Sequence, residues 1–227
     1  MVESRNNMAE MAMARANVYG LLADVFRGEP SIELLAKLGE PEISGSLKAI
    51  NLSLDEMFEG TTNEQLVEDL AIEFTRLFIG PNNHISPHES MHTEVRSGEK
   101  KSLWGDQTVE VKKFMQAAGL QTDDSFGGMP DHISAELEFM QQLLKKEADA
   151  WINEDDETAG NILSIEKRFF DEHLSQWATA FCDTVLEIAE HVFYRQFCDV
   201  TKVFMNFEEE NLADLVVEAQ KSARLSA

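Results

Sequence analysis

The sequence predicts an all-α protein, and three observations support this prediction. Apolar residues recur at helical spacing along most of the chain, strand-type alternation is nearly absent, and glycine or proline follows the stronger helical segments. With 227 residues, of which 43% are hydrophobic, the chain can bury a full core. We therefore expect one all-helical domain over residues 1–227, with about 9–12 helices.

Four helices are expected in the first third of the chain, over residues 8–26, 32–38, 42–51 and 63–79. The first ends before Gly28 and Pro30, and the fourth ends before Gly80-Pro81. Glycine frees the backbone there, and proline cannot continue a helix because it lacks an N–H. The fourth helix carries an apolar stripe, formed by Leu66, Leu70, Phe74 and Leu77 and widened by Val67 and Phe78.

Two long polar stretches follow, with one helix between them. Residues 80–103 should form a loop with one short turn, residues 105–118 a helix, and residues 119–130 a second loop. Such loops are longer than a helical bundle usually needs, and long loops are often functional. We expect a hinge-like loop region between an N-terminal part, about residues 1–120, and a C-terminal part, about residues 131–227. A hinge of this kind allows either a monomer or a domain-swapped dimer.

The C-terminal part is expected to hold five helices. The first covers residues 131–151, and the acidic tract at residues 153–157 is typical of a solvated turn. The other four follow the apolar periodicity over residues 162–170, 172–193, 194–208 and 211–224.

Charge and composition limit the classes of partner. The formal net charge is −23, from 19 basic and 42 acidic residues, which disfavours binding to nucleic acid and anionic membrane. The charge would attract a basic partner such as a peptide, and the alternative is that it serves solubility alone. No run of about 18 apolar residues is present, so we expect no membrane insertion. Cys182 and Cys198 lie among apolar neighbours, which indicates core residues and a reducing cytoplasm.

The segment from Gly128 to Met140 contains a candidate recognition site. Asp131 follows a proline-ended loop at the position of a helix N-cap, with His132 in the first turn. An apolar stripe continues behind this pair at helical spacing: Ile133, Leu137, Met140 and Leu144. A polar pair on the edge of an apolar helix suits recognition, and the alternative is a plain cap beside a surface histidine.

His84, His88 and His92 form the one pattern that suggests metal chemistry. Their spacing of four would place three imidazoles on one helical face, but Pro87 interrupts a helix there. The sequence contains no glycine-rich phosphate loop. We therefore expect no metal, no cofactor and no enzymatic activity.

Several segments, taken in order, resemble the TorD/DmsD family of cytoplasmic chaperones for molybdenum-containing redox enzymes. Glu73–Pro81 resembles the signature with an aromatic residue followed by Leu-Phe-x-Gly-Pro, and Pro87-His88-Glu89-Ser90 resembles the Pro-x-Glu-Ser loop. Further matches are Leu103-Trp104-Gly105-Asp106, Pro130-Asp131-His132 with Glu136–Met140, and His173-Leu174 with Trp177 and residues 189–194. The likeness covers roughly residues 8–208.

The resemblance implies an all-helical, non-enzymatic chaperone of the cytoplasm. Such a chaperone binds the twin-arginine signal peptide and the apo-form of a molybdoenzyme precursor, and it delays export until the molybdopterin cofactor has been inserted. Members of the family have been linked to guanine nucleotides, whereas this chain lacks a phosphate loop.

The resemblance also suggests which residues bind the peptide, whose basic head and apolar segment require an acidic rim and an apolar groove. Phe74, Leu77 and Phe78 are expected to contribute groove wall, although the same stripe also suits a bundle core. Polar contacts are expected from Asp131 to an arginine, with His132 orienting Asp131. The remaining candidates are Pro87, His88, Glu89, Ser90 and Glu136, of which Glu136 can also pair internally.

Two other functions stay open at this point. One is an assembly factor that binds a mature enzyme subunit, as the related nitrate-reductase chaperones do. The other is a metal-dependent enzyme that uses His84, His88 and His92.

Overall fold

The computed structural model describes residues 2–49, 54–81, 84–93, 101–119 and 128–226. These residues form ten α-helices and three short helical segments, and none of them lies in a strand, which confirms the predicted all-α class. The elements are α1 (Val2–Arg27), α2 (Ile32–Gly39), α3 (Pro41–Ala49), α4 (Asp55–Phe58), α5 (Asn63–Phe74), η1 (Thr75–Ile79), η2 (Glu89–Met91), α6 (Asp106–Ala117), α7 (Ile133–Ile152), α8 (Asp156–Phe169), η3 (Phe170–Leu174), α9 (Ser175–Ile188) and α10 (Val192–Ser226).

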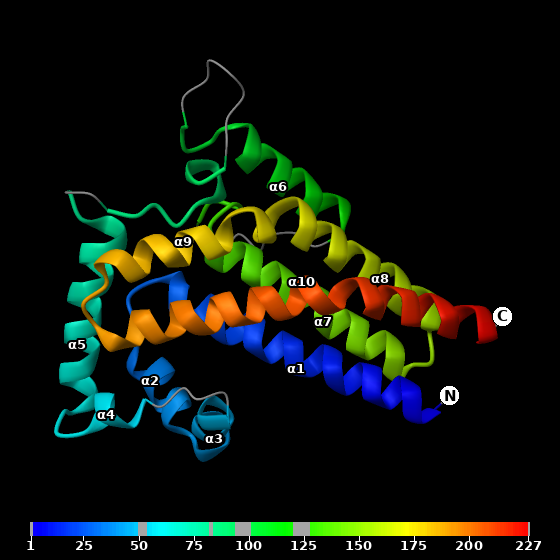
Figure 1. Cartoon of the computed structure of the whole chain (residues 1–227), viewed down its shortest axis with the longest axis horizontal. Helices are drawn as coiled ribbons and strands as arrows, with labels where there is room; N and C mark the ends of the chain where they lie inside the picture. Colours follow the sequence, from blue (N-terminus) through cyan, green and yellow to red (C-terminus); the bar gives the residue numbers. More distant parts are fainter. Residues whose placement is uncertain (1, 50–53, 82–83, 94–100, 120–127, 227) are drawn as a thin grey trace.

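A bundle of α1, α7, α8 and α10 forms the main body of the molecule. In Figure 1 these helices run side by side along the long axis, α5 stands across one end, and α6 lies on the outside near η3 and α8. Large fully buried side chains fill the bundle, among them Tyr19, Phe26, Trp151, Trp177 and Phe181. None of the described helices is long and apolar enough to cross a bilayer.

The predicted helix at residues 63–79 is present, but it changes geometry near its end. Thr62 and Gln65 form a reciprocal capping box at the start of α5, which satisfies two free backbone donors. After Phe74 the backbone widens into the π-helical segment η1, which Gly80 closes by donating its N–H to the Thr75 carbonyl at 2.7 Å. The π-helical segment η3 similarly leads into α9.

The helices predicted at residues 194–208 and 211–224 are in fact one helix, α10, so the predicted break was wrong. The acidic run from Glu208 to Glu210 contains no glycine or proline, and Glu208 is buried against Arg15 of α1 rather than solvated in a turn. The real break lies earlier than residue 193. The N–H groups of Glu190 and His191 donate to the Glu73 carboxylate at 2.7 and 3.1 Å, and this holds the chain in a non-helical connection.

The long loops are described only in part. Residues 84–93 contain the short turn η2, which agrees with the prediction of a short turn within residues 80–103. Residues 82–83, 94–100 and 120–127 lie outside the described residues, and so does most of the predicted hinge at residues 119–130.

Candidate functional site

Two segments that carry sequence motifs meet at the start of α7. The Ile133 N–H donates to the Pro87 carbonyl at 2.9 Å, and the Glu89 N–H donates to the Asp131 carbonyl at 2.9 Å. These bonds form an isolated antiparallel bridge between His88 and His132. The two motifs are therefore one structural unit, which joins the loop before η2 to the helix α7.

Asp131 is not the N-cap of this helix, contrary to the sequence prediction. Its side chain is fully buried, and Oδ2 accepts hydrogen bonds from the Ser90 N–H at 3.2 Å and the Thr108 hydroxyl at 3.0 Å. Asp131 thus ties α6 and the 88–90 loop to α7. Its Oδ2 atom already has partners within the protein and the whole side chain is buried, which gives Asp131 a positioning role in this conformation.

His132 takes the capping role instead. Its Nδ1 accepts the Ser134 N–H at 3.2 Å. Burial, with a further contribution from nearby His88, lowers the pKa of His132 to about 4. The ring is therefore neutral near pH 7, as an Nδ1 acceptor must be.

Glu89 and Glu136 lie beneath this bridge, and both side chains are buried. The His173 Nδ1 contacts the Glu89 carboxylate at 3.0 and 3.3 Å, and the Trp177 Nε1–H donates to Glu136 at 3.1 Å. Burial, followed by the charge of Glu89, raises the pKa of Glu136 well above its ordinary value. The neutral form of Glu136 is thus favoured in the folded protein, and Glu89 is the side chain that contacts His173.

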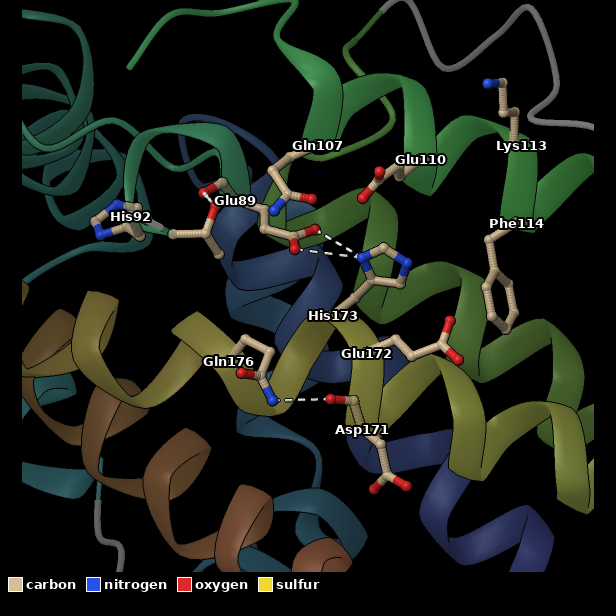
Figure 2. Close-up of a pocket in the computed structure, with 11 residues that line it drawn as sticks. Glu89, His92, Gln107, Glu110, Lys113, Phe114, Asp171, Glu172, His173 and Gln176 are labelled. Carbon is tan, nitrogen blue, oxygen red and sulfur yellow. Dashed lines mark hydrogen bonds and ion pairs between the residues drawn. The ribbon is translucent and has the colours of Figure 1, made fainter. Parts of the chain in front are cut away.

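A cleft opens above this pair, with a volume of about 890 Å³. Figure 2 shows α6 on one side, η3 and the start of α9 on the other, and Glu89 with His173 between them. The cleft is lined by Glu89, His92, Thr93, Gln107, Glu110, Lys113, Phe114, Asp171, Glu172, His173 and Gln176.

Two of the carboxylates along this cleft already pair with basic residues that lie four positions earlier in the chain. Asp171 pairs with Lys167, and Glu172 pairs with Arg168 at 3.4 Å. Glu110 is exposed and forms no ion pair with any residue that the structure describes. The cleft is therefore acidic, and Glu110 carries the charge that is available to a ligand.

The expected groove residues Phe74, Leu77 and Phe78 are buried in the core. Phe78 lies 5.9 Å from Tyr194 and 6.0 Å from Phe181, measured between ring centroids. These three aromatic and aliphatic side chains anchor α5 and η1 to the bundle, and they do not line the cleft.

The three spaced histidines do not form a metal cluster. His84 is exposed, His88 Nδ1 contacts the Ser86 hydroxyl at 3.0 Å, and His92 Nε2 contacts the Ser86 carbonyl at 2.7 Å. Across the described residues, no group of three potential ligands is placed to hold an ion. The His92 ring stacks on Trp177 instead.

Sequence reasoning did not assign His173, Trp177, Gln107 or Glu110 to the site. A signal for the first two was present, because His173 and Trp177 stand four residues apart and so share one helical face. No local pattern marks Glu110 among the many acidic residues of the chain.

Comparison with known proteins gives a consistent set of relatives. A family model described as nitrate reductase delta subunit matches residues 40–183. The chaperone protein TorD of Shewanella piezotolerans is 23% identical over 211 residues, which cover 87% of this chain and 91% of that protein. TorD of Colwellia psychrerythraea is 23% identical with 92% and 96% coverage, and TorD of Vibrio atlanticus is 24% identical with 88% and 94% coverage.

Proposed function

The chain belongs to the nitrate reductase delta subunit family, and from this premise we propose that it is a chaperone dedicated to one molybdoenzyme precursor. Membership agrees with the TorD/DmsD resemblance of the sequence motifs. The similar proteins are named chaperones, a class that performs no chemical step, and the chain is not an enzyme.

The client segment that fits the cleft best is a twin-arginine signal peptide. Its basic head complements a cleft bordered by Glu110, Asp171 and Glu172, in a protein with a net charge of −23. Charge-assisted hydrogen bonds to arginine set the register of the peptide. The acidic cleft beside the bridged motifs is the observation that carries the proposal.

The apolar segment of such a peptide requires an apolar surface next to the acidic cleft. Leu103 and Trp104 provide one, because their side chains are 48% and 68% exposed directly before α6, the helix that forms one wall. Trp104 also has a φ of 67°, an uncommon value for a residue with a side chain. These residues take over the role first expected of Phe74, Leu77 and Phe78.

The other expected site residues support the cleft from beneath. Asp131 and His132 hold the loop that carries Pro87, His88 and Ser90, and Glu136 lies behind Glu89. In this proposal the chaperone acts in the cytoplasm and binds the precursor, both signal peptide and apo-enzyme. Export then waits until the molybdopterin cofactor has been inserted into the client.

Calorimetry with a synthetic twin-arginine peptide tests the proposal. We expect the Arg-Arg→Lys-Lys peptide to bind about tenfold more weakly, because lysine cannot form the paired hydrogen bonds of a guanidinium. The double variant Glu110→Gln/Glu172→Gln should bind the arginine peptide more weakly than wild type. The matched variant Glu157→Gln/Glu187→Gln, with both changes at exposed sites outside the cleft, should bind like wild type. The proposal fails if no signal peptide encoded near this gene binds.

A second function is favoured by the family description itself, nitrate reductase delta subunit. An assembly factor of that kind would bind a mature enzyme subunit rather than its leader. Co-purification with a client that lacks its signal peptide separates the two functions. Equal recovery of the full and the truncated client would favour the assembly factor.

A further inference from the structure

The imidazole of His173 is held rigidly at the floor of the cleft. It lies on η3, it is buried, and its ring packs against Phe169, at a centroid distance of 5.0 Å, and against Phe114, at 5.7 Å in a T-shaped arrangement. The Glu89 carboxylate contacts the Nδ1 atom, and a carboxylate can only accept a hydrogen bond. Glu89 therefore places the proton of this ring on Nδ1.

The second nitrogen of His173 faces the ligand space. Figure 2 shows Nε2 on the side of the ring away from Glu89, toward the space between Glu110, Phe114 and Glu172. No residue that the structure describes bonds this atom. An imidazole that carries a single proton, on Nδ1, has a lone pair on Nε2, so in this tautomer the cleft floor presents a hydrogen-bond acceptor.

The wall formed by α6 adds further acceptors and an aromatic ring. Gln107, Glu110 and Phe114 lie about one turn apart along this helix and all line the cleft. The guanidinium carbon of Arg168 already lies 4.9 Å from the centre of the Phe114 ring, so this ring can pair with a planar cation. Lys113 also lines the cleft, but in Figure 2 its ammonium lies at the outer end, away from His173.

A guanidinium group matches this arrangement better than other common side-chain groups. It is always charged, it donates five N–H bonds and accepts none, and its plane can lie against an aromatic ring. A lysine ammonium shares the charge but is compact and lacks the planar fork. A carboxylate or phosphate would face the Glu110 carboxylate and the acceptor atom of His173.

We propose that the floor of the cleft is a guanidinium subsite in which His173 Nε2 accepts an N–H of an arginine side chain and Glu110 pairs with its charge. Glu89 is a positioning residue: it holds the ring proton on Nδ1 and so leaves Nε2 as the acceptor that faces the ligand. This subsite rests on the proposed function, since the arginine comes from the basic head of the signal peptide. It goes further by assigning the specificity for arginine to one imidazole nitrogen.

The first test uses N-acetyl-arginine amide and N-acetyl-citrulline amide as probes, titrated near pH 8 and followed by NMR. Citrulline has almost the shape of arginine but no charge, so it should bind about tenfold more weakly. In Glu110→Gln this preference for arginine should shrink. Equal binding of the two probes to the wild-type protein would overturn the subsite.

The second test separates His173 from its structural role. In His173→Asn the amide nitrogen can replace Nδ1–H as a donor to Glu89, whereas the acceptor at Nε2 is lost. Loss of the buried ring should lower the melting temperature, but the protein should stay folded, and we expect a roughly tenfold loss of affinity for N-acetyl-arginine amide. The matched control is His191→Asn, because His191 is a partly buried histidine outside the cleft whose Nδ1 accepts the Phe193 N–H.

The third test reads the tautomer directly from the ¹⁵N shifts of the His173 ring. The wild-type protein should carry the proton on Nδ1. Glu89→Gln can donate to Nδ1 instead, which would move the proton to Nε2 and weaken arginine binding. A wild-type proton on Nε2, or unchanged arginine affinity in His173→Asn, would overturn the subsite. If the subsite is overturned but a signal peptide still binds, the chaperone function stands. If the arginine probe binds but no signal peptide does, the subsite is supported and the chaperone function is refuted.

Discussion

Two buried groups of carboxylates in this protein differ in whether they contain a cation. The bundle cluster consists of Arg15 with Glu147, Glu166 and Glu208, contributed by α1, α7, α8 and α10. Arg15 forms two hydrogen bonds of 2.8 Å to Glu208 and lies 3.1 Å from Glu166. The cleft-floor cluster consists of Glu89, Asp131 and Glu136, and no described lysine or arginine forms an ion pair with it.

This difference separates a structural role from a binding role. The bundle cluster contains its own arginine and joins all four bundle helices, so its charges are balanced in part within the fold. The cleft-floor cluster has only ring, hydroxyl and backbone donors, and Glu89 borders a cleft. A cation supplied by a client can approach the second cluster and cannot reach the first.

The largest effect is expected from removing the cation of the bundle cluster. Arg15→Met leaves three buried glutamates without their partner, and the free energy of unfolding should fall by about 3–5 kcal/mol. Urea denaturation measures this loss. Lys37→Met is the control, because Lys37 pairs with Asp24 at 3.0 Å on the surface, and such pairs contribute less than about 1 kcal/mol. Similar losses in both variants would remove the distinction between the clusters.

A smaller loss is expected from the cleft-floor cluster. Asp131→Ala leaves the Ser90 N–H and the Thr108 hydroxyl without their acceptor, which should lower the free energy of unfolding by about 1–3 kcal/mol. Peptide affinity should fall with it, since the 88–90 loop is released. Asp131→Asn keeps an acceptor oxygen and should lose less of both. A lower melting temperature with unchanged affinity would show that Asp131 is purely structural.

The pH dependence of stability should come partly from Glu166. Burial, followed by the nearby charge of Glu147, raises the pKa of Glu166 well above its ordinary value of 4.5. A group whose pKa is higher in the folded protein contributes stability that is fully present below its unfolded pKa, and this contribution is lost as pH rises through the folded pKa. Arg15 opposes this by favouring the charged form, but burial outweighs it.

Glu166→Gln should therefore gain stability relative to wild type as pH rises. We expect the difference to grow by about 1–2 kcal/mol between about pH 5 and about pH 8. Thermal unfolding across this range measures it, with the exposed change Glu157→Gln as the control. A constant difference at all pH values would show that Glu166 is charged in the folded protein.

The smallest effect on stability is expected at the cleft wall. Glu110 is exposed and outside both clusters, so Glu110→Gln should change the free energy of unfolding by less than about 0.5 kcal/mol. Its affinity for a twin-arginine peptide should nevertheless fall by about 1 kcal/mol. Glu218→Gln, at an exposed position of α10, should leave both unchanged. Equal affinities for the two variants would show that the peptide head binds elsewhere.

Helix positions were largely predictable because their signals are local. We located α5 from the stripe of Leu66, Leu70 and Phe74 and from the closing Gly80-Pro81. The predicted helix, residues 63–79, has the observed start and end, but its last turn is the π-helical segment η1. The short helix α4 was missed, and so was the continuity of α10 through Glu208. In α10 the sequence signal was misleading, because a run of three glutamates suggests solvent while one of them binds a buried arginine.

The site was predictable only as a set of segments. The motifs around Pro87 and Asp131 were identified from the sequence, and the structure brings them together. Their side chains proved to support a cleft from beneath, and its exposed lining residue Glu110 on α6 carried no local signal. Exposure decides which acidic residues can meet a ligand, and exposure depends on how the helices pack.

The sequence by itself determined the helical class, the order of most helices and the acidic character of the protein. Apolar spacing and turn residues involve only residues that are close in the chain, and net charge is a sum over all residues, so none of them depends on how the chain folds. Tertiary structure decided which carboxylates are paired. Arg15 and Glu208 are 193 positions apart, and Glu89 and His173 are 84 positions apart. Hydrogen bonds and ion pairs act only over a few ångströms, so such contacts exist only after the helices have packed.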